Sequence, residues 1–452
     1  MDAMTASISG VVLLLILLVT GVHIGFALIA AGIAGLIVVL GSFTPVITSV
    51  VSAFYHKVSM PALVTVPLFV LMGFLASGGG ISRQLYESLS LWLGRFRSGL
   101  GVATVVACTA FGTVCGSSLV TAAVFAKISA PEMRRCGYDK RLAYGICASA
   151  GAIGMLIPPS ILAIVYGILS GESIGKLLMA GVAPGLLLMV VFSSQIIFYY
   201  AKFKPEMLNV GGMGVVKKAT LKEQLASLKH WWSVAIVAVI IFGGMYGGVF
   251  SPSEGSAVAA FVLLVIYLGL GYANRHKPRE SGLTMKQELA SIFNETAVTS
   301  SMIFFVMGGA TVFSNFITLT GVTGQISTFL TGAGIAKINV VLIIMVIILI
   351  LGCFLDSTSI LCVTIPVFNP IIKSLGIDPI WYATCVIMAA EVGLITPPFG
   401  LNVFATKGAA EPDVGLEDVF AGSMSFFLGM VAVLLLLLFV PIVATFLPSF
   451  VE

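Results

Sequence analysis

The stretch GAIGMLIPPS, residues 151–160, places two adjacent prolines inside an apolar segment that is otherwise typical of a membrane-spanning helix. The same pattern returns as EVGLITPPFG, residues 391–400. A proline has no N–H, so the carbonyl four residues earlier loses its helical partner. The pairs predict two broken helices with freed carbonyls at residues 154–155 and 393–394. In lipid an unpaired carbonyl costs several kcal/mol. A kink satisfied by neighbouring groups is one interpretation; because the break recurs, we favour two cation sites.

The composition is that of an integral membrane protein. The chain has 452 residues, of which 9% are charged, against about 25% in soluble domains, and its mean hydropathy is +1.12. At about 20 residues per span, the apolar runs allow roughly ten to twelve crossings or re-entrant pieces. The N-terminus predicts a first span and not a cleaved signal peptide. The cysteines and histidines form no metal-binding pattern, and nothing indicates nucleic-acid binding or an organic cofactor.

An internal repeat relates the two halves of the chain. The motif GTVCGSS (112–118) aligns with GCFLDST (352–358), 240 residues later. Isolated residues recur 239 positions later, which pairs Pro131 with Pro370, Gly137 with Gly376, Asp139 with Asp378 and Gly154 with Gly393. A nearly constant offset through several Pro and Gly positions predicts two copies of one structural unit.

The basic residues indicate that the two copies are inverted. Segment 127–141 holds five Lys and Arg residues and its partner 370–379 holds one, while 80–97 holds three and 321–336 none. Lys and Arg mark cytoplasmic loops, so the copies should insert with opposite orientation, as in secondary transporters. Segment 98–126, between two basic segments, is too short for two crossings and predicts a re-entrant hairpin.

Two hydroxyl-rich turns are expected at the hairpin tips, at Ser117–Ser118 and at Asp356–Ser359. Oxygen donors suit Na⁺, although hydroxyls can instead bond to their own helix. Asp356 and Glu391 are carboxylates in apolar sequence, which makes them functional candidates. Asp356 could bind a cation or cap a helix, and either carboxylate could carry a proton, so H⁺ coupling stays open. Asn402 is a candidate contact for a polar substrate.

Other energy sources and chemistries find little support. The stretch GESIGKL (171–177) lacks the spacing of a phosphate-binding loop. Glu254 in SPSE predicts a capping box at a helix start. The stretches TLKEQLASL (220–228) and TMKQELASI (284–292) predict amphipathic helices at the cytoplasmic interface, each with a capping box. No catalytic set is present, so we expect a transporter and not an enzyme.

At this point the sequence resembles a known family. GTVCGSSLVTAAVFAKISAPEM, GMLIPPS, LGCFLDSTSILCVTIPVFNPII and EVGLITPPFGLNVF look like the large membrane (permease) subunit of tripartite ATP-independent periplasmic (TRAP) transporters, DctM type. The resemblance implies an elevator-type, Na⁺-driven transporter of the ion-transporter superfamily in the bacterial inner membrane. It implies two partners, a small four-helix membrane subunit and a periplasmic substrate-binding protein. It also implies organic-acid substrates such as C4-dicarboxylates, sialic acid and other sugar acids.

The resemblance also implies which residues bind ions and substrate. The first Na⁺ site would use Cys115, Ser117, Ser118, Gly154, Ile157 and Pro159. The second would use Asp356, Ser357, Thr358, Gly393 and Thr396. The substrate would contact Ser118, Asp356, Ser359 and Asn402. Cys115 stands where the family often has Ser, and Ser357 where it often has Pro.

The expected fold is an all-α integral membrane protein with inverted repeats, two re-entrant helical hairpins and two unwound helices. The expected divisions are N-terminal spans (1–78), transport-domain half 1 (79–175, with hairpin 98–126 and broken helix 142–170), scaffold spans and amphipathic helices (176–296), a scaffold span (297–320), transport-domain half 2 (321–410, with hairpin 338–370 and broken helix 379–406) and a C-terminal span (411–452). The expected function is Na⁺-coupled uptake of an organic acid. The alternatives are a stand-alone Na⁺- or H⁺-coupled dicarboxylate or anion carrier, or a passive channel.

Overall fold

The computed structural model describes residues 3–96, 98–208, 220–245, 247–273 and 283–450. Residue 97 of the basic segment 80–97, and residues 209–219 and 274–282 of the polar segments 202–230 and 273–296, lie outside these ranges. Within them the chain is helical, and one isolated antiparallel bridge joins Tyr138 and Leu208. A helix satisfies its backbone groups internally, which is what a hydrocarbon environment requires.

The first half opens with helices that precede the first hairpin. The apolar run 8–42 is divided at residues 20–23, between two helices. The helices are α1 (Ala3–Val19), α2 (Ile24–Leu40), α3 (Phe43–Val58), α4 (Thr65–Gly78, after the 3₁₀ turn Pro61–Val64) and α5 (Ile81–Leu93).

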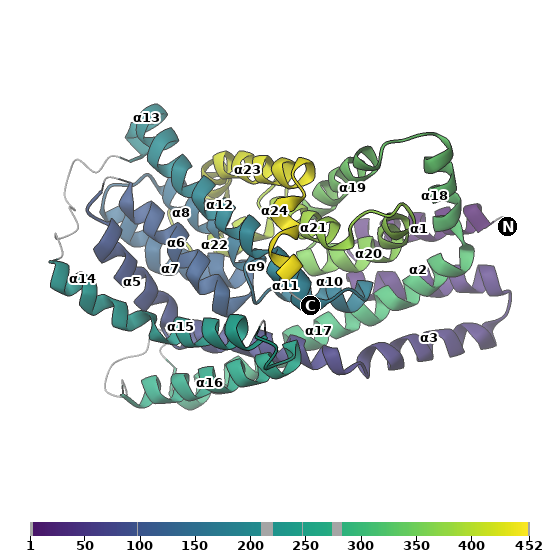
Figure 1. The fold of residues 1–452 in the computed structure, drawn as a ribbon, viewed down its shortest axis with the longest axis horizontal. Helices are drawn as coiled ribbons and strands as arrows, with labels where there is room; N and C mark the ends of the chain where they lie inside the picture. The colour runs from purple at the N-terminus through teal and green to yellow at the C-terminus, as the bar shows by residue number, and fades with distance from the viewer. Residues whose placement is uncertain (1–2, 97, 209–219, 246, 274–282, 451–452) are drawn as a thin grey trace.

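At the segments predicted to form hairpins and broken helices, the structure has paired helices separated by short breaks (Figure 1). The pairs of the first half are α6 (Gly99–Cys115) with α7 (Ser118–Arg135), and α8 (Lys140–Gly151) and α9 (Ile153–Leu156) with α10 (Ile161–Ser170). Those of the second half are α19 (Lys337–Gly352) with α20 (Ser357–Ser374), and α21 (Pro379–Gly393) with α22 (Leu401–Ala409). Helix α7 continues past the expected end of the hairpin at residue 126, so most of the basic segment 127–141 is helical.

The other helices connect and flank these pairs. Between the halves lie α11 (Ile174–Ala180), α12 (Val182–Ser194, continued by the π-helical Gln195–Tyr200), α13 (Ala201–Phe203), α14 (Leu221–Ser227), α15 (Trp232–Ala238, continued by the π-helical Val239–Met245) and α16 (Pro252–Ala273). The second half begins with α17 (Met285–Thr320) and α18 (Val322–Gly332), and the chain ends with α23 (Leu416–Phe439) and α24 (Ile442–Thr445). Helix α23 packs along α8.

Helix α17 differs from the sequence-based expectation. The capping box at Thr284 and Gln287 is present, as is the one at Thr220 and Glu223. However, the stretch 284–292 is not a separate helix, because α17 runs for 36 residues from it into the following span. No proline or glycine separates the amphipathic stretch 284–292 from the apolar span that follows, so the two parts form one helix.

Helices α2 and α17 pack closely because glycines of α2 lie against large side chains of α17. A Cβ at Gly25 would lie 2.5 Å from the ring of Phe305, and one at Gly32 would lie 2.9 Å from Val312. Small residues at such contacts are typical of helix pairs in membranes, where packing and not the hydrophobic effect drives association.

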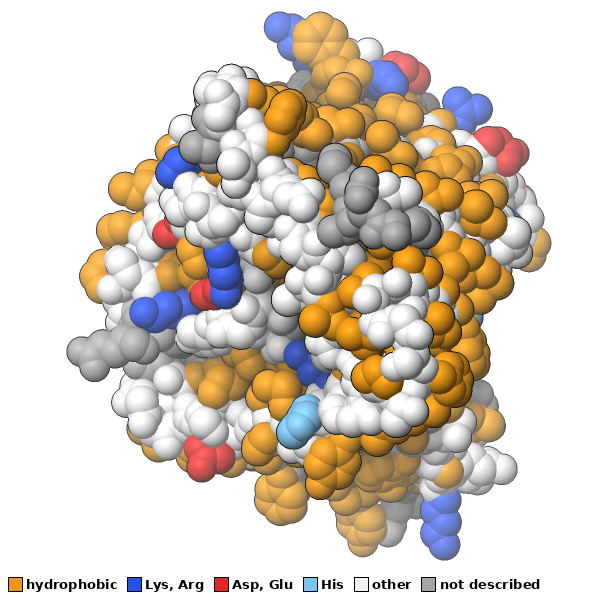
Figure 2. All heavy atoms as spheres, turned by 90° about the vertical axis from the view of Figure 1, so that its right-hand side faces the viewer, with side chains coloured by type: hydrophobic (Ala, Val, Ile, Leu, Met, Phe, Trp, Pro, Cys, Tyr) orange, Lys and Arg blue, Asp and Glu red, His pale blue; other side chains and the backbone are white. Residues whose placement is uncertain are grey.

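The outer surface is apolar, as a bilayer requires. In the described part of the chain, six helical segments are long and apolar enough to cross a membrane, one bent pair (Lys140–Leu156 with Ile161–Ser170, at 43°) passes the same test, and five shorter apolar helices accompany them. Figure 2 shows hydrophobic side chains spread over much of one face, with few charged ones. Exposed side chains on α3, such as Phe43, Ile47 and Val51, contribute to this apolar exterior.

Candidate functional site

The first hairpin tip is a turn of two residues between α6 and α7. Gly116 has φ of 63°, a left-handed conformation that favours glycine, and a Cβ there would lie 2.6 Å from the carbonyl oxygen of Pro159. Ser117 caps α7, and its hydroxyl oxygen accepts a hydrogen bond from the Val120 N–H at 3.5 Å. The turn therefore brings the tip directly against the broken segment of the first half.

The second tip is capped by a carboxylate. Asp356 precedes α20, and its Oδ2 accepts hydrogen bonds from the N–H groups of Thr358 at 3.0 Å and Ser359 at 3.2 Å. The Ser359 hydroxyl donates to Asp356 Oδ1. Of the roles that the sequence allowed for Asp356, the structure shows helix capping, in which both carboxylate oxygens accept hydrogen bonds.

The same backbone contact occurs within each half, where a glycine of the hairpin lies against a glycine of the broken helix. In the first half Gly112 of α6 faces the Cα of Gly154, and in the second a Cβ at Gly352 of α19 would lie 2.7 Å from the Cα of Gly393. Glycine allows this approach because it has no side chain to separate the helices. The predicted repeat positions therefore make the same contact in both halves.

The caps sharpen the alignment of the repeats. Ser117 and Asp356 are both N-caps, and Ser118 and Ser357 are both first helical residues. These pairs are 239 residues apart, whereas Gly112 and Gly352 are 240 apart. The motif alignment, which placed Ser117 opposite Ser357, is thus shifted by one residue within the tips, between the glycines and the caps.

The prediction of freed carbonyls is confirmed in one half and wrong in the other. Among the described residues, no backbone N–H donates to the carbonyls of Gly154 or Met155. In the second half the Gly393 carbonyl accepts from the Thr396 N–H at 3.0 Å and the Leu394 carbonyl accepts from the Asn402 N–H at 3.0 Å. The longer break there, residues 394–400, lets the chain fold back onto its own carbonyls. Each carbonyl still has a second lone pair available to a cation.

Glu391 connects the two tips. Its Oε1 accepts hydrogen bonds from the hydroxyl of Ser118 at 3.5 Å and of Ser357 at 3.0 Å. The side chain is fully buried, and its Oε2 has no partner among the described residues. A carboxylate, two hydroxyls and two helix N-termini therefore converge from both halves of the repeat.

Asn402 lies near this centre in sequence and is left unpaired. It is the second residue of α22, its side chain is fully buried, and neither its Oδ1 nor its Nδ2 has a partner within the described chain. Thr406, one turn later, and Ser149 on α8 are also buried, and their hydroxyls have no partner among the described residues. Helix α22 packs against α7 and α8, so this interface holds polar groups that a ligand or water would satisfy.

The remaining predicted ligands include Cys115, Thr396 and Ile157, which have different surroundings. Cys115 is buried, its thiol lies 3.9 Å from the Ser117 carbonyl, and its own carbonyl lies 2.5 Å from a Cβ built at Gly73 of α4. The Thr396 hydroxyl donates to the Val392 carbonyl at 2.7 Å. Ile157, in the break before Pro158, is buried. Sequence reasoning did not identify Gly112, Gly352, Thr406 or Ser149; the first two could have been found as glycines at equivalent repeat positions.

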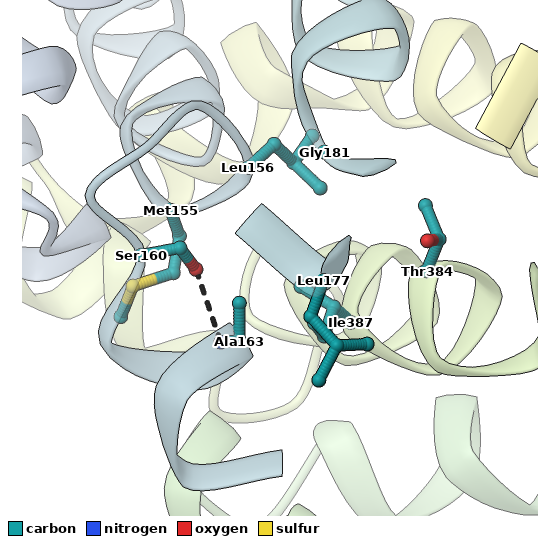
Figure 3. A pocket seen from close by; sticks show the side chains of 8 residues that line it. All are labelled: Met155, Leu156, Ser160, Ala163, Leu177, Gly181, Thr384 and Ile387. Carbon is teal, nitrogen blue, oxygen red and sulfur yellow. Dashed lines mark hydrogen bonds between the residues drawn. The ribbon is translucent and has the colours of Figure 1, made fainter. Parts of the chain in front are cut away.

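A small pocket lies beside the break of the first half (Figure 3). Its two hydroxyls are engaged, since Ser160 Oγ accepts from the Ala163 N–H at 3.2 Å and Thr384 Oγ1 donates to the Ile380 carbonyl at 2.9 Å. The lining residues are Met155, Leu156, Ser160, Ala163, Leu177, Gly181, Thr384 and Ile387. This lining is mostly apolar and carries no charge, so it offers little to an anion.

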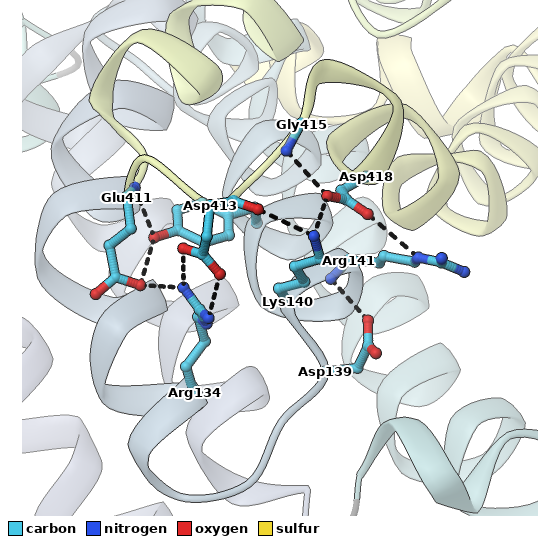
Figure 4. Close-up of polar contacts among 9 residues, drawn as sticks. Arg134, Asp139, Lys140, Arg141, Glu411, Asp413, Gly415 and Asp418 are labelled. Atoms are coloured by element: carbon cyan, nitrogen blue, oxygen red, sulfur yellow. Dashed lines mark hydrogen bonds and ion pairs between the residues drawn. The ribbon is translucent and has the colours of Figure 1, made fainter.

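Charged side chains join α7 and α8 to the loop before α23 and to α23 itself (Figure 4). Arg134 at the end of α7 pairs with Glu411 and, at 2.7 Å, with Asp413. Lys140 and Arg141 of α8 pair with Asp418 of α23 at 2.6 and 3.3 Å. The hydrogen bond from Arg134 holds the pKa of Asp413 below its ordinary value. Ion pairs from the basic segment 127–141 thus connect α7 and α8 to α23 and the loop before it.

Broken helices packed against capped helix tips are typical of secondary transporters built from repeats. A crystal structure of the YdaH transporter of Alcanivorax borkumensis has a similar fold, with a TM-score of 0.59 at 15% identity over 87% of each chain. The family description "Tripartite ATP-independent periplasmic transporter, DctM component" matches residues 11–443. The chain therefore belongs to the DctM family of TRAP large permease proteins and is a multi-pass protein of the bacterial inner membrane.

Relatives in this family transport different compounds. The chain is 31% identical to the C4-dicarboxylate TRAP transporter large permease protein DctM of Pseudomonas aeruginosa, over 92% of this chain and 93% of that protein. It is also 31% identical to the isethionate TRAP transporter permease protein DctMQ of Oleidesulfovibrio alaskensis, over 95% of this chain and 64% of that longer protein. Equal identity to both leaves the substrate of this chain open.

Proposed function

We propose that this chain is the large permease subunit of a Na⁺-coupled TRAP system that takes up an organic acid by an elevator mechanism. The observation that supports the proposal best is the convergence of both capped tips on Glu391. Na⁺ would bind between each tip and the adjacent broken helix, using hydroxyls and backbone carbonyls, and would order the tip.

In this proposal the first Na⁺ site lies between α7 and the break at 157–160. Its support is the Pro159 carbonyl against Gly116 and the carbonyls of Gly154 and Met155, to which no described backbone N–H donates. The second site lies between α20 and the break at 394–400, beside the contact of Gly352 with Gly393. Because Asp356 caps its helix, ligation there would rest mainly on carbonyls and on the hydroxyls of Thr358 and Thr396.

The substrate would bind where the N-termini of α7, α20 and α22 approach the centre, since helix N-termini favour negative charge. Ser118, Ser359 and Asn402 are the proposed contacts, with the Asn402 amide supplying donors that are unused in this structure. The substrates named for the two relatives are both small organic anions, which supports an organic acid as the cargo.

The proposed partners are a small membrane subunit and a periplasmic substrate-binding protein. The longer DctMQ relative, of which this chain covers 64%, supports a small membrane subunit as a partner. In the elevator proposal the transport halves, 79–175 and 321–410, move together. The ion pairs of Arg134 with Glu411 and Asp413 would hold the first half to the loop that directly follows the second half.

Reconstitution tests the proposal. Liposomes that contain this chain with its small subunit, supplied outside with the binding protein and labelled substrate, should accumulate substrate only with an inward Na⁺ gradient. A proton gradient of equal size in Na⁺-free choline medium is the matched control. Accumulation that is unchanged without Na⁺ would overturn the coupling, and passive, non-saturable flux would indicate a channel.

A further inference from the structure

The Glu391 carboxyl group occupies a position that neither cation site alone explains. Through one oxygen it accepts hydrogen bonds from Ser118, the first residue of α7, and from Ser357, the first residue of α20. These helices belong to opposite repeats. The carboxyl group therefore lies near the positive ends of two helix dipoles, which stabilise a negative charge.

Burial nevertheless leaves this charge incompletely compensated. The side chain is fully buried and its Oε2 has no partner among the described residues. A buried carboxylate that accepts only from neutral hydroxyls is costly unless a positive charge lies close to it.

The charged groups on the elements packed around α21 do not supply that charge. In the described chain none of them contacts Glu391, and several are paired elsewhere. Lys373 of α20 contacts Glu172 and the Ser170 carbonyl, Lys337 of α19 contacts the Gly376 carbonyl, and Asp418 of α23 pairs with α8. The others on these elements are Asp356 before α20, Lys176 on α11 and Glu417 on α23.

The repeat has no second copy of this charge. Position 391 corresponds, 239 residues earlier, to Ala152 between α8 and α9. Two symmetry-related tips are thus served by one carboxylate. A carboxylate that served only one cation site would contact one tip, and the repeat would place an equivalent carboxylate at the other tip. Glu391 instead contacts both tips and has no equivalent in the first repeat.

We propose that Glu391 is the negative charge shared by the two cation sites, and that it makes Na⁺ binding at one site favour binding at the other. This inference rests on the proposed function. Ser118 is a residue of the first site and Ser357 of the second. A cation at either site fixes the serine that holds the carboxylate and so places its charge for the other site. The shared charge also offsets the repulsion between the two cations.

Thermal unfolding of the purified large and small subunits, titrated with Na⁺ against choline at constant ionic strength, tests the inference without measuring transport. The wild type should respond with a Hill coefficient above 1. Glu391→Gln keeps the size of the side chain and the acceptor for both serines but removes the charge. Its Hill coefficient should fall to about 1 and its half-saturating Na⁺ should rise at least about tenfold, as expected for loss of a nearby charge.

Glu254→Gln is the matched control, because Glu254 is an exposed carboxylate that accepts from the Ser251 N–H at 2.8 Å in a capping box. Its Na⁺ titration should match that of the wild type. Where Glu391→Gln fails to fold, Glu391→Asp keeps the charge but is too short to reach both tips, and it should also lower the Hill coefficient to about 1.

The outcomes separate this inference from the proposed function. A wild type that does not respond to Na⁺ overturns the Na⁺ coupling and the inference together. A cooperative wild-type response that is equally cooperative in Glu391→Gln or Glu391→Asp overturns the shared charge and leaves the Na⁺ coupling standing.

Discussion

Gly393→Ala perturbs the contact between the second hairpin and its broken helix most directly. A Cβ at residue 393 would lie 2.5 Å from the Cα of Gly352 and 2.9 Å from its carbonyl carbon. Carbon atoms in contact are normally about 3.5–4.0 Å apart, so the two backbones must separate by roughly 1 Å. Both neighbouring atoms belong to the backbone, so no side chain can rotate away.

Overpacking of this kind costs about 1–3 kcal/mol, so Gly393→Ala should unfold at a lower temperature than the wild type. The same displacement moves the Gly393 carbonyl, a proposed ligand of the second cation site. A loss of about 1.4 kcal/mol in Na⁺ binding corresponds to a tenfold higher Na⁺ requirement. We therefore expect half-maximal uptake at about tenfold higher Na⁺, measured in proteoliposomes.

Gly408→Ala is the matched control, because Gly408 lies in α22 and no atom lies within 4 Å of its built Cβ. Alanine favours a helix by up to about 1 kcal/mol over glycine, so this variant should be as stable as the wild type or more so. Stability and Na⁺ dependence of Gly393→Ala equal to those of Gly408→Ala would refute the close approach of the two helices.

Three further variants test other parts of the structure. Thr396→Val removes a hydroxyl at nearly constant volume and should raise the Na⁺ needed for half-maximal uptake; an unchanged value would remove Thr396 from the second site. Lys57→Met removes the hydrogen bond that the α3 ammonium donates to the Ile168 carbonyl at 2.7 Å; it should cost about 1.5–3 kcal/mol in thermal or denaturant unfolding, and no loss would show that the bond does not form in the membrane. Arg134→Ala breaks the partly exposed pairs with Glu411 and Asp413 and should lower the free energy of unfolding by at most about 1 kcal/mol. A loss of more than twice that value would mean that the cluster is buried in the assembled transporter.

The repeat and its breaks could be predicted from sequence because they depend on local chemistry. Proline cannot donate to a helix, a capping box lies within four residues, and basic segments are visible as composition. The pairs 154 with 393 and 158 with 397 therefore locate both broken helices from the sequence alone. Helix ends such as Arg135 were less certain, since nothing local stops α7 at residue 126.

The contacts between the repeats could not be predicted in the same way. Whether the Gly393 carbonyl is free depends on how far residues 394–400 fold back, which no motif specifies. The bond between Ser118 and Glu391 joins residues 273 positions apart, and its existence depends on the packing of both halves. The equivalence of Ser117 with Asp356 depends on both being helix N-caps, which the motif alignment does not encode.

The central claim is that two related cation sites lie at the two tips. Equilibrium binding of radioactive ²²Na⁺ to the purified large and small subunits tests it most directly, without substrate or transport. The account predicts saturation at two Na⁺ per large subunit and a weakened second site in Thr396→Val. Absence of saturable Na⁺ binding, or a stoichiometry of one that Thr396→Val does not change, would contradict it.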